Sequence, residues 1–264
     1  MKPKRNIQME EHNSISDFAG IKSIYINTAD VDIKLITTKS DSLKVEQSRP
    51  FNSLESLLYK LDITGDEEKL AVSIKPRNFL GYIPFISFAE KLVLYMYMPE
   101  GVECVVAETG SGNITTSGGL EVQNVILSTI NGKICAKIKR GEVHIKTFNG
   151  RINCDLECDV FRVKTTFSKI KLSVLKSCEG RVENLCGDME IHILNDVGCI
   201  VKTIAKSSPI RFFTGEEIEW GEKKRASFLG IKVSTVRNAK IGDGGCVLET
   251  NSIWGKTKIY DNMD

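Results

Sequence analysis

The stretch GEVHIKTFNGRINCDL (141–156) decides the fold. Apolar residues alternate with polar ones in its first half, so Val143 and Ile145 point to one side, and its second half repeats the alternation. This period of two is typical of a strand with one buried face. Asn-Gly (149–150) separates the halves, and both residues tolerate the positive φ angles of tight turns. The stretch therefore predicts two short strands joined by a corner.

Four other segments share this form: NVILSTINGKICAKI (124–138), DVFRVKTTFSKIKLSV (159–174), EGRVENLCGDMEIHIL (179–194) and VGCIVKTIAKSSPIRF (197–212). A further segment, ETGSGNITTSG (108–118), reads as the second half of such a unit only. The isoleucine-type position recurs at Ile114, Ile134, Ile152, Ile170, Met189 and Ile210, which gives a repeat of about 18–21 residues.

An antiparallel meander would also use Asn-Gly turns, but it does not need the same residue at the same corner of every unit. A solenoid does, because each corner stacks on the next one. We therefore predict an all-β, single-stranded β-solenoid or β-helix, with parallel rungs about 4.8 Å apart. Right-handed winding is the default for parallel crossovers.

The flanks predict irregular β caps around the regular rungs. Residues 18–101 contain short strands, with a hairpin between 56–63 and 69–75, and residues 213–264 contain further strands. We expect one continuous domain over 1–264, with a flexible N-terminus (1–17), an N-terminal cap (18–101), regular rungs (102–212) and a C-terminal cap (213–264).

Composition excludes several classes. The net charge of +2 draws the chain to neither nucleic acid nor membrane, and no nucleic-acid motif or apolar run of membrane-spanning length is present. No apolar run follows the basic N-terminus, so the chain as written is expected in the cytoplasm, with envelope association only through a partner. The eight cysteines form no CxxC pair and read as small buried residues, so no metal or cofactor is predicted.

Several stretches together resemble the bacterial putative-adhesin β-strand-repeat family, a domain of unknown function. They are FAGIKSIYINTADVDIKLI (18–36), LVLYMYMPEG (92–101), the corners SGNI, NGKI and NGRI, and the ending ETNSIWGKTKIYD (249–261). The resemblance implies a β-helix-like fold, supplies no catalytic residues, and suggests display on a surface.

Two outward columns carry cations on successive rungs. The column after the corner reads Asn113, Lys133, Arg151, Lys169 and Asp188, and the column before the threonine reads Ser128, Lys146, Lys164, Glu183 and Lys202. Cations about 5 Å apart repel one another, and a polyanion such as an acidic polysaccharide, a teichoic-type polymer, a nucleic acid or an anionic lipid surface would offset that cost. The alternative is a solvated face neutralised by nearby acids.

The segment NFLGYIPFISFAEKL (78–92) is a second candidate contact. It gathers Phe79, Tyr82, Phe85 and Phe88 in one stretch. Such a loop either caps the solenoid end or exposes an apolar patch to a partner.

Three functions from different classes follow. The leading one is a non-enzymatic scaffold that binds an envelope polymer, a surface or a protein partner. A carbohydrate-active β-helix enzyme would need clustered carboxylates, for which Asp155, Glu157 and Asp159 are the candidates, although they fall where a turn is expected. His144 and His192 lie on different rungs and complete no nucleophile–base–acid set. The third is a structural or regulatory module that assembles edge to edge.

Overall fold

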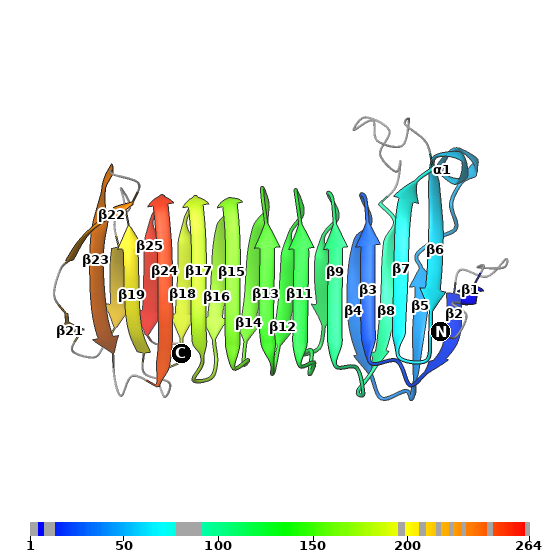
Figure 1. Ribbon diagram of the computed structural model, residues 1–264, viewed down its shortest axis with the longest axis horizontal. Coiled ribbons are helices and arrows are strands. Elements are labelled where there is room, and N and C mark those ends of the chain that lie inside the picture. Colours follow the sequence, from blue (N-terminus) through cyan, green and yellow to red (C-terminus); the bar gives the residue numbers. More distant parts are fainter. Residues whose placement is uncertain are drawn as a thin grey trace. The chain divides into compact units, whose positions relative to one another are not determined.

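The structure is a computed structural model, and it describes residues 5–7, 14–77, 91–194, 199–205, 210–214, 218–221, 224–228, 231–241 and 245–261. The chain divides into two compact units, Met1–Lys137 and Ile138–Asp264. The elements are strands except for one short helix in the described residues, which confirms the all-β class. Figure 1 shows the strands of each unit side by side.

The first unit contains twelve strands and the helix. They are β1 (Arg5–Ile7), β2 (Ser14–Ala19), β3 (Ser23–Thr28), β4 (Asp32–Thr38), β5 (Ser42–Gln47), α1 (Ser53–Leu58), β6 (Tyr59–Gly65), β7 (Lys69–Pro76), β8 (Val93–Pro99), β9 (Cys104–Thr109), β10 (Ile114–Ser117), β11 (Asn124–Thr129) and β12 (Ile134–Ile138).

These strands belong to two sheets, with β1-β6-β7-β3-β9-β11 in one (sheet A) and β2-β5-β8-β4-β10-β12 in the other (sheet B). A rung is one strand of sheet A followed by the next strand of the chain in sheet B. The rungs stack in the order β7/β8, β3/β4, β9/β10 and β11/β12, and the pairing between them is parallel. Beyond β7/β8 the pairing becomes antiparallel.

The second unit contains thirteen strands. They are β13 (Glu142–Thr147), β14 (Arg151–Leu156), β15 (Val160–Phe167), β16 (Lys169–Val174), β17 (Glu179–Cys186), β18 (Met189–Ile193), β19 (Cys199–Ala205), β20 (Ile210–Thr214), β21 (Glu219–Trp220), β22 (Lys224–Phe228), β23 (Ile231–Ile241), β24 (Cys246–Trp254) and β25 (Thr257–Asp261).

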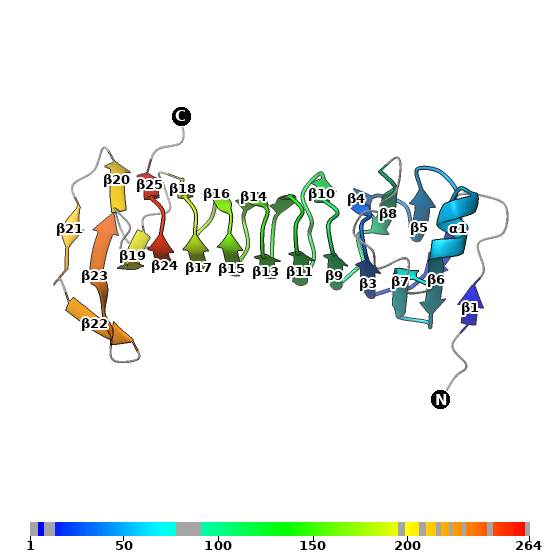
Figure 2. The same cartoon turned by 90° about the horizontal axis from the view of Figure 1, so that it is seen from above.

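Its rungs stack in the order β13/β14, β15/β16, β17/β18, β24/β25 and β19/β20, again in parallel. Figure 2 shows β15 and β17 in one layer and β16 and β18 in the other. Strand β23 then pairs antiparallel with β19, β21 and β22.

The alternation read from residues 141–156 is the alternation that the strands adopt. Val143 and Ile145 of β13 are buried, while His144 and Lys146 lie on the outer face. In β14 the inward residues Ile152, Cys154 and Leu156 are buried. In this unit the two sheets therefore enclose an apolar interior, because each strand turns its apolar face toward the other sheet.

Successive corners pack against one another through the threonine and the glycine of the repeat. The Gly132 N–H donates to Thr129 Oγ1 at 2.9 Å, and that hydroxyl donates to the carbonyl of Gly112 at 3.1 Å. A Cβ on Gly132 would overlap the Gly112 carbonyl oxygen, far inside the 3.0 Å that real Cβ atoms respect. Gly132 is not among the glycines with positive φ. The sequence analysis explained this glycine by a positive φ angle, and that explanation was wrong. Glycine is required at position 132 because two rungs approach each other closely there.

The predicted stacking of residues 197–212 directly on 179–194 is wrong. The C-terminal rung β24/β25 lies between them, so Met189 pairs with Thr257, and Thr257 pairs with Ile210. The six-member apolar column is therefore interrupted, because the last rung of the chain inserts between two rungs that are consecutive in sequence.

The N-terminal flank is also more regular than predicted. Strands β3 and β4 form a full rung beside β9/β10, and β9 supplies the first half that segment 108–118 was predicted to lack. The hairpin between β6 and β7 is confirmed. Residues 53–58 of its flank form α1 instead of a strand, because Asn52 and Glu55 make a reciprocal capping box at its start.

The apolar segment 78–92, with Phe79, Tyr82, Phe85 and Phe88, falls almost entirely outside the described residues, which resume at Lys91. Its role as a cap or a partner contact stays a prediction, as does the single continuous domain.

Candidate binding surface

The cations before the corner lie on the outer face of sheet A. The parallel register of β13 and β15 sets Lys146 beside Lys164, and both are exposed. Glu183 of β17 follows in the same row, with its Oε2 3.4 Å from Lys164 Nζ. The row therefore consists of two cations that end at an acid.

The cations after the corner lie on the outer face of sheet B. Arg151 of β14 stands beside Lys169 of β16, and both are exposed. Asp188 follows Lys169 in this row, because the next residue, Met189, pairs with Ile170 of β16. The Asp188 carboxylate accepts the Lys256 N–H at 2.8 Å. This second row also consists of two cations followed by an acid.

The two rows lie on different sheets but flank the same corners. Lys146 ends just before the corner residues 147–150, and Arg151 follows them directly. In the next rung, Lys164 and Lys169 take the same positions around residues 165–168. The four cations therefore border one edge of the second unit from both sides.

Lys133 belongs to the first unit. It is exposed and stands beside Asn113, whose side-chain oxygen accepts the Lys133 N–H at 2.9 Å. On the side of β10, the neighbour of Lys133 in its row is thus polar and uncharged, as the sequence column Asn113, Lys133 predicts.

Toward β17 the outer face of sheet A is balanced by acids. Arg162 lies in register with both His144 and Arg181. The Arg181 guanidinium donates to Glu183 at 2.8 Å. His144 Nε2 lies 2.8 Å from Glu142 Oε1, and this hydrogen bond lowers the pKa of the exposed Glu142 carboxyl. The basic character is concentrated on the rungs of β13 and β15.

The predicted position of Lys202 in the row of Lys146 and Lys164 is wrong. Because β24 inserts, Lys202 pairs in register with Glu249, and Glu249 pairs with Arg181. Glu249 lies 3.6 Å from Lys202 and 3.9 Å from Arg181, so it bridges two cations of flanking strands.

The corners bordered by the four cations carry aromatic side chains that the sequence analysis missed. Phe148 and Phe167 are both about half exposed, at 51% and 50%, with ring centroids 5.6 Å apart at 78°. The sequence does carry a signal for them, a large apolar residue at an outward position near the corner threonine. Phe148 directly follows Thr147, and Phe167 comes two residues after Thr165.

The three acids considered for catalysis do not share a strand face. Strand β14 ends at Leu156, so Asp155 lies on the strand while Glu157 and Asp159 follow it. Asp159 Oδ1 accepts from Lys176 Nζ at 2.5 Å, and this hydrogen bond lowers the pKa of Asp159.

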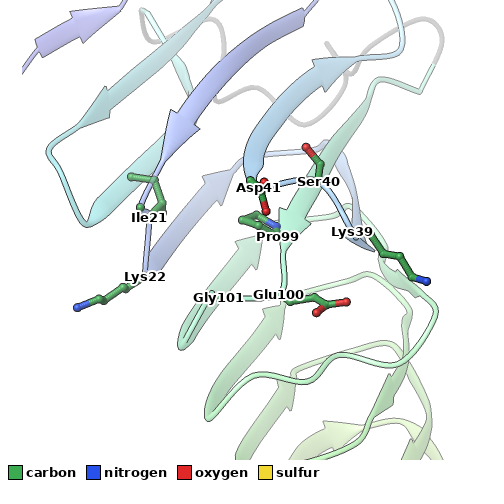
Figure 3. Close-up of a pocket in the computed structure, with 9 residues that line it drawn as sticks. Ile21, Lys22, Lys39, Ser40, Asp41, Pro99, Glu100 and Gly101 are labelled. Atoms are coloured by element: carbon green, nitrogen blue, oxygen red, sulfur yellow. The ribbon is translucent and has the colours of Figure 1, made fainter.

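A surface pocket of about 630 Å³ lies in the first unit (Figure 3). It is lined by Gly20, Ile21, Lys22, Lys39, Ser40, Asp41, Pro99, Glu100 and Gly101. The side chains of Lys22 and Lys39 point away from each other in Figure 3. Lys22 is held by Glu68 at 2.9 Å, which raises the pKa of this exposed lysine. The charges around the pocket therefore do not converge on one ligand group.

Five of the eight cysteines are buried: Cys154, Cys158, Cys178, Cys199 and Cys246. Cys178, which directly precedes β17, and Cys246, the first residue of β24, have their sulfurs 3.5 Å apart, both as free cysteines. Burial raises the pKa of Cys158 to about 12, so this thiol stays protonated. These residues fill interior positions as small side chains.

The fold and its outer columns define a class: an all-β repeat protein that presents side chains in rows. The chain belongs to the Toastrack DUF4097 family, whose model matches residues 21–206. This confirms the resemblance to the putative-adhesin repeats. In the described part of the chain, no helix is long and apolar enough to cross a membrane.

Among solved structures, the chain is similar to a "putative cell adhesion protein" from Clostridium sporogenes and a "putative adhesin" from Bacteroides fragilis. The first is 11% identical, with a TM-score of 0.37 over 94% of this chain and 98% of that one. The second is 11% identical, with a TM-score of 0.40 over 94% of this chain and 96% of that one. No curated protein matches the chain significantly.

Proposed function

We propose that the protein is a non-enzymatic, adhesin-like binding scaffold that holds an anionic partner along the edge bordered by Lys146, Lys164, Arg151 and Lys169. The single observation that carries this proposal is the register. Parallel strands set like charges beside each other on two sheets around the same corners.

Such rows cost free energy in the unbound protein. Two like charges about 5 Å apart in water repel by roughly 1 kcal/mol. An anionic partner with repeating charges relieves this repulsion and releases its own counterions, and both effects favour binding. The acids Glu183 and Asp188 end the rows, so the proposed site spans the rungs of β13 and β15.

Finer features of the fold belong to the same proposal. We infer that the rungs wind to the right, since this is the default hand for parallel crossovers. The antiparallel strands beyond β7/β8 and beyond β19 act as caps that stop edge-to-edge pairing.

Retention on a heparin column tests the site. The Lys146→Glu/Lys164→Glu and Arg151→Glu/Lys169→Glu variants are each expected to elute at clearly lower salt than the parent chain. The matched control is Lys75→Glu/Lys240→Glu, which changes two exposed lysines on other strands. If the control lowers retention as much as the two site variants do, the partner is held by overall charge and the proposed site is wrong.

The other classes give different results. A carbohydrate-active enzyme would release products from an acidic polysaccharide, and Asp155→Asn/Asp159→Asn would abolish that release. An assembly module would show a mass in solution scattering above the 29.4 kDa of one chain. The binding scaffold predicts neither outcome.

A further inference from the structure

One edge of the second unit carries a line of half-exposed aromatic side chains. The rings are those of Phe148, Phe167 and Trp254, with Cys186 between the last two, and we call these four residues the corner ridge. Phe167 pairs in register with Cys186, and Cys186 pairs with Trp254. The Phe167 N–H donates to the Phe148 carbonyl at 2.8 Å, which joins the first two members.

The rings of the corner ridge are large and remain in water. Trp254 is 53% exposed, close to the values of Phe148 and Phe167. Isolated exposed apolar side chains are common on protein surfaces, but here three large rings lie along one edge, with the partly exposed Cys186 between Phe167 and Trp254. Such a line gains free energy from any partner that removes it from water.

Cations stand on both sides of the part of the corner ridge that carries Phe148 and Phe167. Lys146 and Lys164 border it on sheet A, and Arg151 and Lys169 border it on sheet B. Lys164 reaches Glu183, whereas the other three form no ion pair with any residue that the structure describes. The order across the edge is therefore cation, aromatic ring, cation.

We propose that the corner ridge docks on the surface of an anionic lipid bilayer, with the rings at the boundary between headgroups and acyl chains and the four cations on the headgroups. This inference rests on the proposed function and names its anionic partner. Aromatic rings favour the bilayer interface, and each nearby lysine or arginine adds attraction to anionic lipid.

The arrangement favours a lipid surface over a soluble polymer. A hydrated polyanion satisfies the cations but leaves the rings in water, whereas a bilayer offers anionic headgroups and hydrocarbon a few ångströms apart in depth. The protein edge offers matching groups, because the Phe148 and Phe167 rings lie between two rows of long, flexible cationic side chains that can reach the headgroups.

Sedimentation with vesicles tests the proposal. The full chain is expected to bind vesicles of phosphatidylcholine mixed with phosphatidylglycerol, and not vesicles of phosphatidylcholine alone. Phe148→Ser/Phe167→Ser is expected to weaken binding at least about tenfold. Each bordering cation changed to alanine is expected to weaken it about fivefold. The matched control is Val247→Ser, since Val247 is 49% exposed on sheet A at the other end of its strand from Trp254.

Fluorescence gives a second measurement that does not depend on the phenylalanines. In a Trp220→Phe chain, Trp254 is the remaining tryptophan of the two. Its emission is expected to shift to shorter wavelength with anionic vesicles and to stay unchanged with heparin.

The two proposals fail separately. If Phe148→Ser/Phe167→Ser binds anionic vesicles like the parent chain, or Trp254 emission does not shift, the lipid inference is wrong. If the parent chain is retained by heparin through the four cations but ignores vesicles, the partner is a soluble polymer and only this inference fails. If the four cations matter for neither ligand, both proposals fail. Circular dichroism checks that each variant is folded.

Discussion

Replacing Gly132 by alanine is expected to destabilise the first unit strongly, although the change adds only one methyl group. The added Cβ would overlap the Gly112 carbonyl oxygen and would also lie 2.6 Å from Thr129 Oγ1. Neither neighbour is the end of a flexible side chain that can turn away, since one is backbone and the other is bound at both sides.

The magnitude follows from what must move. To make room, the corner of β11/β12 must separate from the corner of β9/β10 by more than an ångström. That separation breaks two hydrogen bonds that join the corners, Thr129 Oγ1 to the Gly112 carbonyl and Asn131 N–H to the Gly110 carbonyl. Leaving a buried polar group without a partner costs about 1–3 kcal/mol. We therefore expect a loss of about 3 kcal/mol or more in the free energy of unfolding.

Urea denaturation followed by circular dichroism measures this loss. The matched control is Gly101→Ala, where a Cβ would meet nothing within 4 Å, and its effect should stay within about 1 kcal/mol. Gly132→Asn separates two explanations, since asparagine tolerates a left-handed backbone but not this close approach. If Gly132→Asn is as stable as the parent chain, or Gly132→Ala matches Gly101→Ala, the clearance argument is refuted.

Three further outcomes are expected. Leu248→Ala, at a fully buried position of the inserted rung, should lower the free energy of unfolding by about 2–5 kcal/mol in urea titrations, and a loss below about 1 kcal/mol would show that this rung is loosely packed. Hydrogen bonds from Arg49 lower the pKa of the Glu55 carboxyl. This carboxylate therefore stabilises the fold at pH values above its unfolded pKa of about 4.3, and the contribution is lost as the pH falls through the folded pKa. The Glu55→Gln variant should lose stability less steeply between pH 6 and pH 3 than the parent chain, and identical stability curves would contradict this. Iodoacetamide should label the partly exposed Cys186 faster than the buried Cys158, whose raised pKa leaves little thiolate, and equal rates by mass spectrometry would refute the difference in burial.

The strands were predictable because their signal is local. Alternation in 141–156 places Val143 and Ile145 inside without any knowledge of neighbouring rungs, and the structure agrees. The helix α1 escaped prediction because its signal is a cap, Asn52 with Glu55, and its apolar residues continue into a strand. Which outward residues share a row depends on contacts between rungs, and that information is not local.

The cations of the candidate surface show the same limit. Lys146 and Lys164 come from rungs that are consecutive in both sequence and space, so their row was predictable. Lys202 was misplaced because β24, which comes more than forty residues later in the chain, lies between β17 and β19, and its register sets Lys202 in the row of Glu249 and Arg181. The two alternatives were equally plausible by charge, since Lys202 finds an acid in either order.

Backbone clearance at the corners offers a reason for the order of the rungs. The inward columns do not decide the order of the rungs, because both Thr257 and Ile210 occupy the column position that Met189 has in its own rung. The rung that stacks on β17/β18 brings Gly255 against the carbonyl of Gly187, where a Cβ would overlap.

The chain between Thr203 and Ile210 contains no glycine, whereas the C-terminal rung has Gly255 at its corner. Ser168 shows the other way to build a corner, since its hydroxyl accepts the Gly150 N–H at 3.0 Å. The Gly187 N–H donates to the Trp254 carbonyl at 2.9 Å, which ties the inserted rung to the corner that it covers. The same contact places Trp254 in line with Phe167, so the insertion that breaks the predicted order of rungs also completes the corner ridge.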